Sequence, residues 1–115
     1  MPPGAERRVR LTAVVHGRVH GVGFRWWTRS RALELGLAGT ATNCPDGTVE
    51  VVAQGRRRSV ETLLTLLSED PPRDPPPGAA ASWRPRPGTV SRVEARWERA
   101  RGDLTGFREA TRRQG

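Results

Sequence analysis

Three glycines precede Arg25 in the segment GRVHGVGFR, which runs from Gly17 to Arg25. Glycines at 17, 21 and 23 let the backbone curl so that successive N–H groups point into one concavity. When a helix N-terminus closes such a nest, it binds a phosphate-sized anion. Arg25 can add two forked N–H donors to phosphate oxygens. The segment therefore predicts an anion site, although glycines also serve any tight turn between a strand and a helix, and their spacing matches neither a Walker nor a Rossmann motif.

A second group of polar residues, TNCPDG, runs from Thr42 to Gly47 and ends another expected strand. A right-handed strand-helix-strand crossover returns the second strand parallel to the first, so both strands finish at the same edge of the sheet. With a third strand between them, their ends are about 10 Å apart. This geometry places Asn43 where it can hold a water opposite the glycine loop, although an Asn before Pro-Asp-Gly is also a common turn former.

The remaining reactive side chains offer weaker alternatives. Cys44 follows Asn43, but no acid-base partner in the sequence is placed to activate it as a nucleophile. His16 precedes the glycine loop and could act as a base, although a structural role is the simpler interpretation. Two histidines and one cysteine give no recognisable metal-ligand spacing, so we expect a metal-independent site without a cofactor.

Periodicity indicates the elements that must position these residues in the first half of the chain. Val9, Leu11, Ala13 and Val15 alternate as in a half-buried strand that ends at Gly17. A helix is expected over about 24–35, where the residues at helical spacing are Trp26, Ser30, Leu33 and Leu37. A hairpin then joins 39–43 to 48–54 through Pro45, Asp46 and Gly47.

The second half of the chain completes the pattern. An amphipathic helix is expected over 57–69, with an apolar face made of Val60, Leu63, Leu64 and Leu67. The proline-rich stretch 71–88 is expected to be a loop. A half-exposed strand follows, in which Val93, Ala95 and Trp97 alternate with charged residues, and Phe107 can anchor a short last strand. The order is α+β and ferredoxin-like (βαββαβ), with two helices on one face of an antiparallel sheet, a fold that hosts many functions.

Composition limits the class of protein. The 115 residues fit a single domain, 1–115, that includes the proline-rich loop and a charged C-terminal tail. The net charge is +8 and all 20 cationic residues are arginines, which we interpret mainly as a genomic bias, although the positive field would attract anions. One cysteine excludes an internal disulfide, and no apolar run suggests a signal peptide or membrane span. We therefore expect a soluble cytoplasmic protein.

The two polar segments resemble the motifs of the acylphosphatase family. The family's loop reads G-x-V-Q-G-V-x-F-R and is matched by Gly17 to Arg25, and its hairpin reads G-x-V-x-N-x-x-D-G-x-V-E and is matched by Gly39 to Glu50. The similarity covers about 9–70 and resumes at 90–97 and near Phe107. The resemblance implies a ferredoxin-like fold and the hydrolysis of an acyl phosphate to a carboxylate and inorganic phosphate.

The resemblance also implies roles for individual residues. Arg25 would bind the phosphoryl group, Asn43 would position the attacking water, and the substrate-binding loop would comprise His20, Gly21, Val22, Gly23 and Phe24. It implies a small-molecule acyl phosphate as substrate, no membrane, no obligate nucleic acid and a monomer.

Three departures from the family pattern are expected to matter. His20 stands where the family usually has Gln, and its charge near pH 6–7 could modulate binding, although a simple variant without a pH role is the plainer interpretation. Ala41 replaces a larger β-former. The stretch 71–88 and the tail from Thr111 leave open whether the end of the chain reaches Arg25, as it does in some members.

Two alternatives to an enzyme remain at the level of sequence. The positive charge and the run Arg56 to Arg58 would suit a ferredoxin-like nucleic-acid-binding module, although the aromatic signature of an RNA-recognition motif is missing. An accessory phosphate-ligand-binding domain would keep the same loop, as acylphosphatase-like modules do within larger carbamoyl-transfer proteins.

Overall fold

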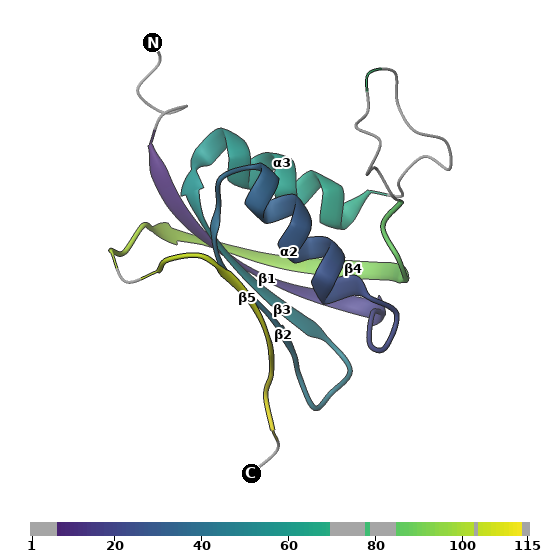
Figure 1. Ribbon diagram of the computed structural model, residues 1–115. Coiled ribbons are helices and arrows are strands. Elements are labelled where there is room, and N and C mark those ends of the chain that lie inside the picture. The colour runs from purple at the N-terminus through teal and green to yellow at the C-terminus, as the bar shows by residue number, and fades with distance from the viewer. Residues whose placement is uncertain (1–6, 70–77, 79–84, 103, 114–115) are drawn as a thin grey trace.

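The computed structural model describes residues 7–69, 78, 85–102 and 104–113. Two helices cover one face of a five-stranded sheet, and none of the described helices lies on the other face (Figure 1). The elements in chain order are β1 Arg8–Arg18, α2 Phe24–Glu34, β2 Ala38–Asn43, β3 Val49–Arg56, α3 Arg57–Ser68, β4 Thr89–Arg99 and β5 Phe107–Thr111. The expected ferredoxin-like order is therefore confirmed.

The strands lie in the order β4-β1-β3-β2-β5. β1 and β2 are both antiparallel to β3, which lies between them, so both strands finish at the same end of the sheet, as predicted. β5 pairs with β2 in parallel, which makes the sheet mixed rather than wholly antiparallel. The predicted last strand thus exists, and it adds an edge beside the strand that carries Asn43.

The core lies between the helices and the sheet. Alternate residues of β1 and β3 face it, as the sequence period requires, and Ala41 of β2 is completely buried among them. The predicted apolar face of α3 is confirmed, since Val60, Leu63 and Leu67 are fully buried and Leu64 packs against the core from a partly buried position. This packing holds β1, and the loop that follows it, against a rigid layer.

The predicted bounds of α2 are close, but two of the residues whose spacing indicated this helix lie outside its buried face. Trp26 and Leu33 are 53% and 46% exposed, whereas the buried residues of the helix are Phe24, Trp27, Thr28 and Ala32. Each residue turns a helix by 100°, so the face that carries Trp26 points away from the core when its neighbour Trp27 points toward it. Trp27 faces the core because its ring packs against that of Phe24, with the ring centres 6.2 Å apart.

β4 is more exposed than its alternating pattern suggests, because it lies at an edge of the sheet. Val93 is half-buried, but Ala95 and Trp97 are exposed. The guanidinium of Arg57, at the start of α3, lies 5.6 Å from the centre of the Trp97 ring. Most of the proline-rich stretch lies outside the described residues. None of the helices in the described ranges combines the length and apolarity needed to cross a membrane.

Candidate active site

The glycine loop leaves the end of β1 and enters α2, as expected. Gly17, Gly21 and Gly23 all have positive φ, at 138°, 69° and 86°. Val19 and Phe24, 2% and 1% exposed, anchor the two ends of the loop in the core, while residues 20–23 are exposed. Within the described ranges, no protein acceptor takes a hydrogen bond from the backbone N–H groups of residues 20–23. These donors, followed directly by the N-terminus of α2, are an arrangement of the kind that can bind an anion.

Arg25 lies in the first turn of α2 and reaches across to β5. Its Nη1 donates to the carbonyl of Ala110 over 2.7 Å and to Oγ1 of Thr111 over 3.2 Å. A guanidinium carries five N–H donors in a fixed plane, so two bonds from one nitrogen orient the whole fork. β5 therefore holds Arg25 in place, and among the described residues the other nitrogens of its guanidinium have no partner.

Asn43 is the last residue of β2 and lies beside the same end of β5. It pairs with Thr111 in the parallel ladder, and its backbone carbonyl accepts a hydrogen bond of 2.7 Å from the N–H of Arg112. Its side-chain oxygen Oδ1 is buried and has no hydrogen-bond partner among the described residues. Because Arg25 binds Thr111 and Asn43 pairs with it, the structure brings the two predicted catalytic residues to the same end of one strand.

His20 ties the glycine loop to the hairpin that carries Asn43. Its Nε2 lies 2.8 Å from the carbonyl oxygen of Thr48, and since a carbonyl only accepts, Nε2 must carry the hydrogen. The same oxygen accepts a 2.9 Å hydrogen bond from the N–H of Cys44. The imidazole of His20 thus cross-links the two segments of the site.

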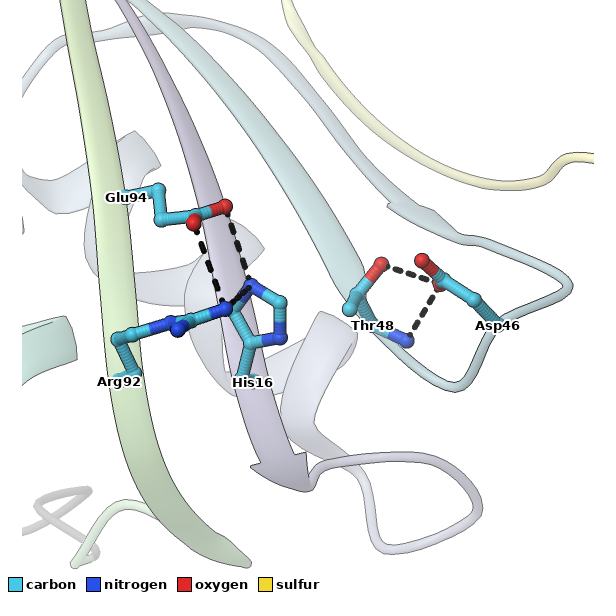
Figure 2. Close-up of polar contacts among 5 residues, drawn as sticks. All are labelled: His16, Asp46, Thr48, Arg92 and Glu94. Atoms are coloured by element: carbon cyan, nitrogen blue, oxygen red, sulfur yellow. Dashed lines mark hydrogen bonds and ion pairs between the residues drawn. The ribbon is translucent and has the colours of Figure 1, made fainter.

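Thr48 is in turn fixed by Asp46, as Figure 2 shows. Oδ1 of Asp46 accepts from Oγ1 of Thr48 over 2.6 Å and from its N–H over 3.0 Å. The hydroxyl bond is the larger cause, and the N–H bond the next, of a pKa of Asp46 that lies below its usual 3.8. The ionised carboxylate therefore locks the turn on which the carbonyl of Thr48 sits.

His16 and Cys44 take no part in the group formed by Arg25, Asn43 and the loop. Nε2 of His16 lies 3.2 Å from Glu94 and 3.4 Å from Arg92, both on β4, and Figure 2 shows the ring turned toward these two residues. Cys44 is buried, and its Sγ lies 3.7 Å from a nitrogen of Arg112 and from the carbonyl of Thr42. Across the described ranges, no three His, Cys, Asp or Glu side chains are grouped closely enough to hold a metal ion.

Sequence reasoning missed the part that β5 plays in the site. Phe107 indicated a strand, but its parallel pairing with β2 and the bonds from Arg25 to Ala110 and Thr111 join residues 85 and 86 positions apart. The one available signal was the open question of whether the end of the chain reaches Arg25. In this structure the contact comes from the main chain and a hydroxyl of β5.

Comparison with known proteins agrees with the geometry. A model of the acylphosphatase family matches residues 11–75. The curated acylphosphatase of Mycobacterium sp. (strain KMS) is 56% identical over 91% of this chain and 97% of its own length, and that of Nocardia farcinica (strain IFM 10152) is 55% identical over 88% and 87%. A solved acylphosphatase structure from Coxiella burnetii superposes with a TM-score of 0.67 at 31% identity, over 95% of this chain and 99% of that one. With two long motifs, the fold and these similarities in agreement, the chain belongs to the acylphosphatase family.

Proposed function

We propose that the chain hydrolyses an acyl phosphate at the site formed by the loop 18–25, Arg25 and Asn43. The observation that carries this proposal is the convergence on one end of β5, where Arg25 binds Thr111 and Asn43 pairs with it. The amides of His20, Gly21, Val22, Gly23 and Phe24 and the remaining nitrogens of Arg25 hold the phosphoryl group. Asn43 holds the water.

Few side chains are required because the leaving group is a carboxylate. The oxygen of water forms a bond to phosphorus, and the bond from phosphorus to the acyl oxygen breaks. The bonding pair leaves with the carboxylate, which is a stable anion at neutral pH and needs no general acid. The water proton passes to an oxygen of the phosphoryl group, so no enzyme base is needed. The protein has to align the reactants and stabilise charge on the phosphoryl oxygens.

The loop and Arg25 supply the charge stabilisation. Donors that are already fixed before the reaction stabilise a developing anion strongly because they need not reorganise. Val19 and Phe24 fix the loop from the core, and Ala110 and Thr111 fix Arg25 from β5. The arrangement is therefore preorganised at both sources of positive potential.

The side chain of Asn43 is suited to hold the attacking water. A buried carbonyl oxygen without a partner lowers stability by about 1–3 kcal/mol, so retaining one at a substrate site favours a functional role. Oδ1 of Asn43 is such an oxygen within the described part of the chain. A water that donates one hydrogen to it would be held opposite the loop, where it can attack in line.

The setting of the reaction is part of the same proposal. A lone, buried Cys44 suits a reducing compartment, and we place the protein in the cytoplasm as a monomer acting on a small acyl phosphate. The nucleic-acid-binding and accessory-domain alternatives are not favoured, because the high identity is to proteins named as acylphosphatases along nearly their whole length.

Hydrolysis of benzoyl phosphate without added metal tests the site directly. Arg25→Ala should lower kcat/KM by at least about 10²–10³-fold, since one preorganised donor is typically responsible for about that much and Arg25 adds charge. Arg29→Ala is the matched control, because Arg29 lies one turn further along α2 and donates instead to the carbonyl of Phe107 over 3.0 Å. Substantial turnover by Arg25→Ala, or an equal loss in Arg29→Ala, would contradict the assignment.

A further inference from the structure

The start of β4 pairs with the residues at which the glycine loop begins. Arg18 pairs with Thr89 and Gly17 with Val90, after a register shift between His16 and Gly17. The shift marks a bulge, and a bulge re-aims the chain that follows it. The residue that precedes β4, Gly88, is therefore adjacent to the first residues of the loop.

Gly88 has no room for a side chain. Its φ is +82°, and a Cβ at this position would lie 2.4 Å from the carbonyl oxygen of Arg18 and 3.2 Å from Cγ2 of Val22. Ordinary van der Waals contact begins at 3.4 Å, so the loop or Gly88 would have to move by about 1 Å. The nearer obstacle is the main chain of the loop itself, which cannot rotate away as a side chain can.

Gly88 is also prevented from receding, because Arg86 anchors the segment to α3. The side chain of Arg86 is buried, at 5% exposure, and its Nη1 donates to the carbonyls of Leu66 over 3.1 Å and Leu67 over 3.2 Å, and to that of Glu69. The carbonyls of Leu66 and Leu67 lie in the last turn of α3 and that of Glu69 follows it directly, and a guanidinium stabilises such a helix end by hydrogen bonding and by its charge. The segment 86–88 is thus held between the end of α3 and the back of the loop.

We propose that Gly88 is a positioning residue of the phosphate loop, acting through the carbonyl of Arg18. With no side chain, it lets the bulged start of the loop lie against β4, so that the amides of residues 20–24 point toward the phosphoryl group. Arg86 keeps Gly88 at that position. The inference rests on the proposed function of the loop, but it concerns residues outside the family motifs of the site.

Gly88→Ala tests the proposal, and Gly78→Ala is its control. Gly78 has nearly the same φ, +81°, but a Cβ there meets no atom of the described residues within 4 Å, so the two variants share the backbone strain and differ in the contact. We expect Gly88→Ala to lower kcat/KM for benzoyl phosphate by about 10²-fold, the effect that a misplacement of about 1 Å can have. The dissociation constant of inorganic phosphate, measured by calorimetry on folded protein, should rise in parallel. Gly78→Ala should leave both quantities unchanged.

Two further variants keep the proposal falsifiable. Adding Val22→Ala to Gly88→Ala should not restore phosphate binding, because the carbonyl of Arg18 remains in the way, and full rescue would overturn the proposed route. If Gly88→Ala does not fold, Arg86→Gln loosens the same segment and should still weaken phosphate binding. Phosphate affinity equal to that of the parent chain in either folded variant, Gly88→Ala or Arg86→Gln, would refute the positioning role.

Measurements on the parent chain distinguish a failure of this inference from a failure of the proposed function. Absence of benzoyl phosphate hydrolysis by the parent chain would refute the proposed function. The positioning role of Gly88 is judged on phosphate affinity alone, which calorimetry measures without turnover.

Discussion

Asn43 carries no charge, so the role proposed for it in the reaction differs from that proposed for Arg25. In the proposed mechanism, Arg25 would bind the phosphoryl group in the substrate, in the product and in the transition state, whereas a water-orienting amide would matter only while water attacks. The two side chains should therefore affect different kinetic constants. Their common link to Thr111 makes a comparison between them direct, because both rest on the same residue of β5.

Asn43→Ala should lower kcat by about 10²-fold, a loss on the scale of one preorganised donor. Inhibition by inorganic phosphate should remain as in the parent chain, because the loop and Arg25 are intact. Steady-state kinetics with benzoyl phosphate at several phosphate concentrations measure both quantities. A parallel loss of phosphate inhibition would instead make Asn43 a phosphate-binding residue.

The hydrogen bonds from Thr48 to Asp46 predict that the stability of the folded protein depends on pH. The folded pKa is depressed below 3.8, so the stabilisation is complete above that pH and is lost as the pH falls through the folded value. Asp46→Asn should therefore lower Tm at neutral pH, and the two melting temperatures should converge in acid. Glu109→Gln is the control, since the exposed Glu109 has no partner among the described side chains. A Tm difference that persists unchanged in strong acid would contradict this origin.

At the scale of elements, α2 and β5 form one unit of the site. Arg25 and Arg29 lie one turn apart on α2 and bind carbonyls at the two halves of β5, those of Ala110 and Phe107. The helix thus fixes both ends of a short edge strand whose other side pairs with β2. Residue identity in β5 matters less than its backbone, because the acceptors are mainly carbonyls.

The end of α3 offers a separate test of element stability. Arg86→Gln removes the charged hydrogen bonds to the last turn of α3, and bonds of this kind contribute about 1.5–3 kcal/mol. We expect the free energy of unfolding in urea to fall by that amount. Arg96→Gln, which removes only an exposed ion pair of 3.1 Å with Glu98, should change it by about 0–1 kcal/mol. Equal effects of the two substitutions would show that the cap on α3 is not stabilising.

Local patterns predicted the elements well, because a period of two or 3.6 is carried by near neighbours. Val60, Leu63 and Leu67 identified the face of α3 correctly. The buried face of α2 could not be read from Trp26 and Trp27, which are identical in hydropathy, because packing against Phe24 selects Trp27.

The candidate site was predictable where topology alone determines it. The end of β2, which carries Asn43, and the glycine loop lie at the same end of the sheet because β1 and β2 are both antiparallel to β3. The bond from His20 to Thr48 and the bonds of Arg25 to β5 could not be predicted, since they depend on how β5 and the hairpin pack in three dimensions. The roles of the individual residues stay predictions until the substitutions above are measured.

For the molecule as a whole, the net charge of +8 acts on an anionic substrate before it reaches the loop. Screening weakens such attraction, as the Debye length falls from about 30 Å at 0.01 M salt to about 3 Å at 1 M. We expect kcat/KM for benzoyl phosphate to fall across this range while kcat changes little. A second salt with a bulkier anion should give the same curve, because competition at the loop would depend on the anion. A kcat/KM independent of salt would exclude electrostatic steering.

The bond between Arg25 and Ala110 closes a loop of 85 residues, and this has a consequence for how the protein matures. Contacts between distant parts of a chain form late and slowly, because the entropy of ordering the intervening residues opposes them. A nascent chain that still lacks β5 could fold its glycine loop but could not fix Arg25. Catalytic competence should therefore be among the last properties to appear during refolding, later than helix content, and the recovery of activity would report the docking of the final strand.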